Sequence, residues 1–110
     1  VFALDVTDAD RSRLLWQFDD TVPGFGDLGQ STSPPVVVHL RVPGRGTAQA
    51  AALIAGGHEP ARDPASGGTT RRGNALYLVD LFSGAPLWSA GAPGAADPHD
   101  LQLPAMVYPV

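Results

Sequence analysis

The segment Tyr77–Trp88, with the sequence YLVDLFSGAPLW, decides the fold. An aromatic residue and two apolar residues precede Asp80, and Gly84 then leads into a second run that ends in Trp88. Two apolar runs separated by a short stretch with a glycine predict a β-hairpin. We expect the carboxylate of Asp80 to accept hydrogen bonds from N–H groups of the turn, and Gly84 to supply a positive φ.

A second copy of this pattern lies near the start of the chain, in Phe2–Trp16 (FALDVTDADRSRLLW). The two aspartates are 75 positions apart and the two tryptophans 72, because the first turn is three residues longer. A repeated sheet that cannot bury its own face stacks on further copies of itself, and a tryptophan offers a large flat surface for that packing. The predicted residues of the structural repeat are Asp5, Trp16, Asp80, Gly84 and Trp88.

The rest of the chain predicts short strands and loops. The 13 glycines and 11 prolines favour turns, and no stretch has the periodicity of an amphipathic helix. The alternation in Leu14–Phe18 places Leu14, Trp16 and Phe18 on one face. Strands are expected at residues 1–6, 14–18, 36–40, 49–55, 75–81, 86–89 and 105–110.

These strands predict an all-β fold built from antiparallel four-stranded blades of a β-propeller, in which sheets stack radially and leave only short edges. We expect residues 1–110 to form a partial propeller of about one and a half blades, a fragment of something larger. Residues 1–20 end one blade, 36–89 form the next, and 105–110 begin a third. The alternative is an ordinary β-sandwich in which the repeated pattern is a coincidence.

The pattern in Leu78–Trp88 resembles the blade signature of propellers of the pyrroloquinoline-quinone type, which many non-enzymatic propellers share. The order of segments along nearly the whole chain resembles the C-terminal propeller of the PilC/PilY family of type IV pilus tip and assembly proteins. The segments that carry this resemblance are Phe2–Thr7, Leu15–Trp16, Asp27–Gly29, Ser33–Pro35, Gly56–Gly57, Gly73–Tyr77 and Met106–Pro109.

This resemblance implies a non-enzymatic structural and binding segment of a secreted bacterial protein at the cell surface or pilus tip. The parent protein would support pilus assembly, adhesion and twitching motility. The expected partners are the remaining propeller blades, and pilus components or a host surface. Two alternatives stay open: a fragment of a quinone-dependent dehydrogenase propeller, and an unrelated β-sandwich binding module.

The sequence departs from the PilC/PilY pattern in one respect. Family members often carry an Asp-rich calcium loop in this propeller, but Asp8-Ala9-Asp10 is followed by Arg11, without the spaced ligands and the glutamate that such loops need. We therefore expect no cofactor in this segment, although calcium remains possible in the parent protein.

No catalytic, cofactor-binding or metal-binding residues are predicted. Gly24–Gly29 matches the glycine pattern of dinucleotide sites, but Pro34 and Pro35 follow too soon for the helix that such a site needs. The chain has no cysteine, its serines lack the context of a nucleophile elbow, and its three histidines have no zinc spacing. The cluster Asp97–Asp100, which includes His99, reads as an exposed loop.

Composition also argues against two classes of partner. The seven basic residues do not gather into a patch, which predicts no nucleic-acid binding. No apolar run approaches the roughly 18 residues of a membrane span.

Overall fold

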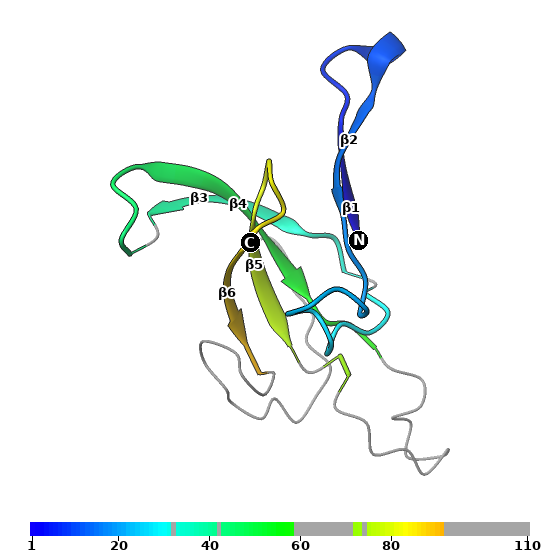
Figure 1. The fold of residues 1–110 in the computed structure, drawn as a ribbon, viewed down its shortest axis with the longest axis vertical. Helices are drawn as coiled ribbons and strands as arrows, with labels where there is room; N and C mark the ends of the chain where they lie inside the picture. The colour runs from blue at the N-terminus through cyan, green and yellow to red at the C-terminus, as the bar shows by residue number, and fades with distance from the viewer. Residues whose placement is uncertain (32, 42, 59–71, 74, 92–110) are drawn as a thin grey trace.

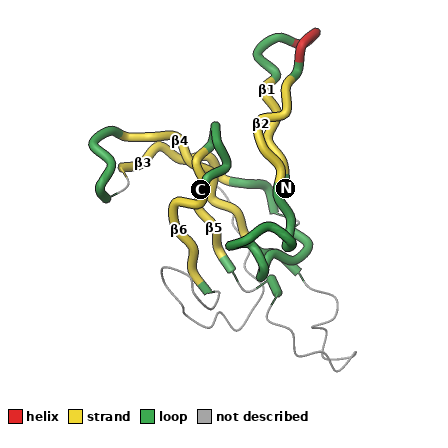
Figure 2. Tube along the Cα trace, viewed as in Figure 1, coloured by secondary structure: helices red, strands yellow, loops and turns green. Residues whose placement is uncertain are grey.

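The computed structural model describes residues 1–31, 33–41, 43–58, 72–73 and 75–91, which form two antiparallel β-sheets and one short 3₁₀ helix, η1 (Figures 1 and 2). The first sheet is a two-stranded hairpin, and the second has four strands in chain order. The elements are β1 (Phe2–Asp5), η1 (Ala9–Arg11), β2 (Arg13–Gln17), β3 (Val36–Arg41), β4 (Ala48–Ala55), β5 (Leu76–Asp80) and β6 (Pro86–Ala90). The predicted all-β fold with antiparallel sheets is confirmed, and the strand predicted at 105–110 lies outside the described residues.

Strand β4 shows how pairing overrides local preference. Its alanine-rich sequence has a high intrinsic helix propensity. In the structure β4 is a central strand, paired with β3 from Ala48 to Leu53 and with β5 from Ala51 to Ala55. The ladder hydrogen bonds on both edges hold this segment extended, so the strand predicted at 49–55 is confirmed.

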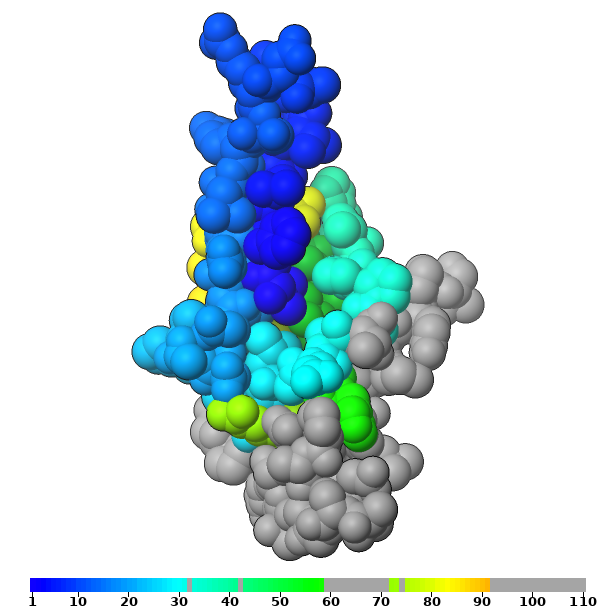
Figure 3. Space-filling view, turned by 90° about the vertical axis from the view of Figure 1, so that its right-hand side faces the viewer, coloured from blue at the N-terminus to red at the C-terminus, as the bar shows by residue number. Residues whose placement is uncertain are grey.

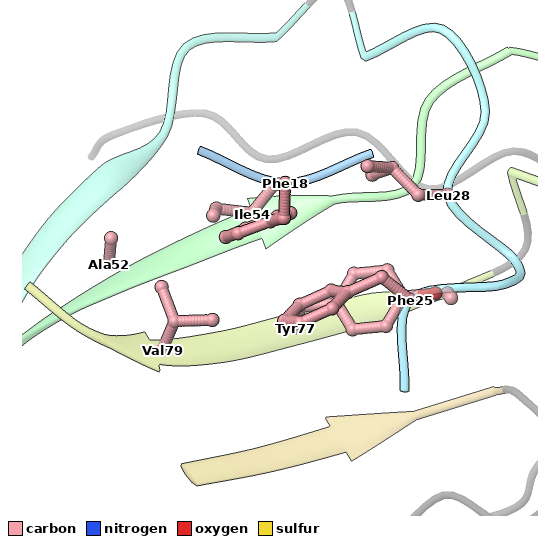
Figure 4. Close-up of a cluster of buried hydrophobic side chains, with 8 residues drawn as sticks. Phe18, Phe25, Leu28, Ala52, Ile54, Tyr77 and Val79 are labelled. Atoms are coloured by element: carbon pink, nitrogen blue, oxygen red, sulfur yellow. The ribbon is translucent and has the colours of Figure 1, made fainter. Parts of the chain in front are cut away.

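A single hydrophobic cluster joins the hairpin to the four-stranded sheet (Figure 4). Phe18, Phe25 and Leu28 lie in the segment that follows β2, and they pack on one face of the sheet. The rings of Phe18 and Phe25 are stacked with centroids 4.0 Å apart. We call this side of the sheet the core face; its side chains in the cluster are Ala52, Ile54, Tyr77 and Val79.

Tyr77 lies at the centre of the core face and is 2% exposed. Its ring lies 5.1 Å from that of Phe25, and burial raises the pKa of Tyr77 to about 12. The phenol therefore stays neutral across the physiological range, and its place in the core carries no charge.

The loop between β2 and β3 is fixed by backbone hydrogen bonds to the end of the four-stranded sheet. The N–H of Gly29 donates to the carbonyl of Gly56 at 2.8 Å, and Gln30 and His58 exchange two bonds as an isolated bridge. These bonds hold the loop in an irregular path with no helix in its described residues. In these described residues Gly24–Gly29, which matches the dinucleotide glycine pattern, is not followed by the helix that such a site uses to hold a phosphate.

The two hairpins of the repeat share one register. Trp16 lies opposite Ala3, and Trp88 lies opposite Leu78, which is the equivalent of Ala3 in the repeat. Each ladder is interrupted immediately after this pair, between Ala3 and Leu4 and between Leu78 and Val79. The repeat therefore extends from sequence to backbone geometry, including a β-bulge at the same place.

The bulge corrects one prediction. Leu14 pairs with Leu4 whereas Trp16 pairs with Ala3, and adjacent residues of a strand point to opposite faces. Leu14 therefore lies on the opposite face from Trp16, and the prediction of one shared face is wrong. The extra residue in β2, Leu15, shifts the alternation by one, which sequence periodicity does not show.

Candidate functional site

The turn after β5 is held by the carboxylate of Asp80. Oδ1 of Asp80 accepts hydrogen bonds from the N–H groups of Phe82 at 3.0 Å and Ser83 at 2.8 Å, and from the Ser83 hydroxyl at 3.0 Å. The N–H of Gly84 donates to the carbonyl of Asp80 at 2.9 Å, and Gly84 has a φ of 71°. The predicted roles of Asp80 and Gly84 are both confirmed.

These bonds to Ser83 and Phe82 hold the pKa of Asp80 below its usual value. A carboxylate with a lowered pKa in the folded state stabilises the fold above its unfolded pKa, and this contribution is lost as pH falls through the folded pKa. Asp80→Asn keeps an acceptor oxygen for the turn but cannot titrate. We therefore expect the variant to lose less free energy of unfolding between pH 7 and pH 3 than the unmodified chain, by under about 1 kcal/mol because solvent screens the site.

Urea unfolding at the two pH values measures this difference, and Asp8→Asn is the control, since Asp8 holds a turn in the other hairpin. An Asp80→Asn chain that loses as much stability on acidification as the unmodified chain would contradict the assignment.

Trp16 from the first hairpin packs on this turn of the second sheet. Its indole Nε1–H donates to the carbonyl of Leu81 at 2.9 Å. A Cβ atom on Gly84 would lie 2.6 Å from Cγ of Trp16, so only a glycine allows the ring to approach this closely. The ring also stacks on Phe18, with centroids 5.1 Å apart and planes 8° apart. The expectation that Trp16 packs against a neighbouring sheet is confirmed.

The corresponding turn of the first hairpin is built differently. Oδ1 of Asp5 accepts from the N–H of Thr7 at 3.0 Å and from its hydroxyl at 2.7 Å, so Asp5 holds its turn as Asp80 does. Oδ2 of Asp5 pairs with Arg13 at 3.4 Å. The three additional residues are accommodated by η1, which Asp8 caps, and the turn contains no glycine.

Trp88 occupies the position of Trp16 in the repeat but not its environment. It is 37% exposed, and within the described part of the chain it has neither the indole hydrogen bond nor the ring stacking that Trp16 has. The packing role predicted for both tryptophans is therefore observed for Trp16. For Trp88, the described residues show no such packing partner.

Two open grooves border the first hairpin. One, of about 610 Å³, lies between the hairpin and the turn after β5, and its apolar lining includes Leu4, Val6, Leu81 and Phe82. The other, of about 410 Å³, has a more polar lining that includes Asp19, Asp20 and Ser33. Both carboxylates of this groove are already partnered: Asp20 pairs with Arg72 at 2.5 Å, and Oδ1 of Asp19 accepts from the N–H and the hydroxyl of Thr21.

Within the ranges that the structure describes, no three His, Asp or Glu side chains gather where they could hold a metal ion. His39 lies on β3 and His58 forms the bridge to Gln30. His99 and the cluster Asp97–Asp100 lie outside the described residues. Among the described residues, no helix is long and apolar enough to span a membrane.

Fold and site together define a class: an all-β chain of repeated hairpins in which a tryptophan of one unit is seated on the glycine turn of the next. No family model, curated protein or solved structure matches the chain.

Proposed function

We propose that this chain is a non-enzymatic structural and binding segment of a β-propeller, in a cell-surface protein of type IV pilus biogenesis or adhesion. The observation that carries the propeller is the contact of Trp16 with Leu81 and Gly84, because it joins two copies of one sequence unit in a fixed geometry. Radial stacking needs such a contact between successive sheets.

The arrangement of the sheets supports the same proposal. The four-stranded sheet β3–β6 is a simple meander, as a blade requires, and the hairpin β1–β2 has the register of the last two strands of that meander. The core face is covered by the segment that follows the first hairpin. In a β-sandwich, two sheets pack face to face. Here the hairpin β1–β2 repeats the strands β5–β6 of the next sheet, and its Trp16 contacts the turn between those strands.

The pilus role rests on the order of sequence segments that resembles the PilC/PilY propeller. In this role the segment presents a rigid surface to pilus components or a host, and its own chemistry is binding. Localisation at the surface or pilus tip and the absence of a resident cofactor are parts of the same proposal.

The test is made in the parent protein in its own cell. Trp16→Ala should separate the two units and reduce surface pili and the diameter of twitching zones, whereas Asp8→Asn, on the exposed turn, should leave both unchanged. Normal pili and twitching in cells whose Trp16→Ala protein is demonstrably misassembled would rule out the pilus role.

A second measurement addresses the enzymatic alternative. The full-length parent protein, supplied with pyrroloquinoline quinone and calcium, should show no oxidation of primary alcohols above the buffer rate. Turnover that depends on both additions would replace this proposal with a quinone-dependent dehydrogenase.

A further inference from the structure

We propose that the open groove between the first hairpin and the turn after β5 binds an extended peptide in which a carboxylate side chain alternates with apolar ones. We call it the hairpin groove; its lining consists of Ala3–Thr7, Arg13, Leu15, Leu81 and Phe82. This inference rests on the proposed function only in taking the segment to bind a partner. It adds the place where that partner binds and the chemistry that recognises it.

The groove follows from where the first hairpin contacts the next sheet. Trp16 meets the turn after β5 at Leu81 and Gly84, so the part of the hairpin nearer its tip continues past that turn. Figure 1 shows this projection of β1–β2, and Figure 3, turned by 90°, shows it again. The three additional residues of the first turn and η1 extend it further. The hairpin groove lies in the step between the projecting hairpin and the shorter turn.

Apolar side chains from both sides line the groove. Leu15 and Leu81 are half-buried, whereas Val6 and Phe82 are 65% and 68% exposed. The turn itself does not require the ring of Phe82, because this residue binds the carboxylate of Asp80 through its backbone N–H. Large apolar side chains that line one groove and remain exposed indicate a surface that a partner covers.

The charged groups of the groove favour an anionic partner. Asp5 and Arg13 are the ionisable side chains in its lining. Both oxygens of the Asp5 carboxylate already accept hydrogen bonds, Oδ1 from Thr7 and Oδ2 from Arg13. The Arg13 side chain, in contrast, is 72% exposed and among the described residues donates one hydrogen bond, of 3.4 Å. The remaining donors of its guanidinium can therefore bind a second carboxylate in bidentate geometry.

The shape of the groove favours a peptide over a small molecule. Small molecules are bound in pockets that bury most of their surface, whereas this groove is open to solvent. An extended peptide compensates for shallow contacts by making several of them. Its alternate side chains point to the same side, so a carboxylate can reach Arg13 while apolar residues two positions away contact Leu81 and Phe82.

The experiment titrates the full chain with a set of acetylated and amidated heptapeptides. Each has a central glutamate, leucine or phenylalanine two positions away on either side, and serine elsewhere. In heteronuclear NMR spectra we expect saturable shifts at Val6, Leu15, Leu81 and Phe82. Replacing the glutamate with glutamine should weaken binding about fivefold, because the charge-assisted hydrogen bonds to Arg13 are lost.

Two pairs of variants locate the contacts. Arg13→Gln should abolish the preference for glutamate over glutamine, whereas Arg11→Gln, at an exposed arginine outside the groove, should retain it. Phe82→Ser keeps the N–H that binds Asp80 and should weaken every peptide about fivefold or more. Val37→Ser, at a similarly exposed position on β3, should leave the affinities unchanged.

A further variant guards against a disturbed hairpin, since Arg13 also pairs with Asp5. Arg13→Lys keeps the charge and should retain more of the preference for glutamate than Arg13→Gln. The absence of saturable shifts from every peptide at about 1 mM would overturn the proposal, as would peptides whose binding Phe82→Ser leaves unchanged. Dimers of the unmodified chain in sedimentation that Phe82→Ser converts to monomers would show that a second copy fills the groove instead, and would also overturn it.

These results and the pilus role are separable. A groove that binds no peptide leaves the pilus role to the twitching assay, which depends on the contact of Trp16 with the next sheet. Conversely, normal twitching in cells with the misassembled protein would leave the peptide binding of the groove intact.

Discussion

Gly84→Ala should destabilise the chain by about 2–5 kcal/mol, because two costs combine at one position. A left-handed φ costs a residue with a Cβ atom roughly 1–2 kcal/mol. The new methyl group would also lie 2.6 Å from Cγ of Trp16, and overpacking of this kind costs roughly 1–3 kcal/mol. Urea unfolding measures the loss, and the emission of Trp16 should move to longer wavelength as the indole is displaced from the turn.

Gly44→Ala separates these two costs. Gly44 also has a positive φ, 82°, but a Cβ atom there would meet nothing within 4 Å. This control should cost only about 1 kcal/mol and leave the Trp16 emission unchanged. Equal effects of the two substitutions would show that the approach of Trp16 to Gly84 contributes nothing to stability.

Trp16→Ala should cost about 2–4 kcal/mol in free energy of unfolding. The substitution removes the stacking on Phe18, the packing on Gly84 and the hydrogen bond to Leu81. Truncation of a buried aromatic residue typically costs roughly 3–5 kcal/mol, and Trp16 is only partly buried. Trp16→Phe keeps the stacking but loses the indole donor, so its cost should fall below that of the alanine variant by more than 1 kcal/mol or so.

Trp88→Ala is the control that the repeat itself provides. The two tryptophans have equivalent positions, but only Trp16 packs on a turn among the described residues. We expect Trp88→Ala to cost less than about 1 kcal/mol, as for a surface position. Should both alanine variants be destabilised to the same extent in thermal or urea unfolding, the distinction between the two environments would be wrong.

The repeat made the hairpins and their turns predictable. Asp80 and Gly84 are local signals, since a carboxylate after a strand and a glycine in the turn act on residues next to them. The packing of Trp16 on the next sheet was also predictable from the repeat, because successive copies of a unit are expected to pack on one another. The partner atoms, the Leu81 carbonyl and the face of Gly84, depend on tertiary geometry that the pattern does not contain.

Two features of the structure had no clear sequence signal. Phe25 and Leu28 lie in a glycine-rich segment that reads as a loop, yet both are core residues because backbone bonds hold that loop against the sheet. The presence of two large apolar residues among the glycines is the sequence signal that could have indicated their burial. The bulge at Leu15 was hidden because simple alternation fits the sequence equally well.

The contact between Trp16 and the turn at Gly84 joins two different surfaces, an indole on one unit and a glycine on the other. Such a junction is heterologous, because its two sides are different surfaces, and it therefore does not close in a symmetric pair. In the propeller that we propose, the angle between the two units at this junction would fix how many units complete the ring.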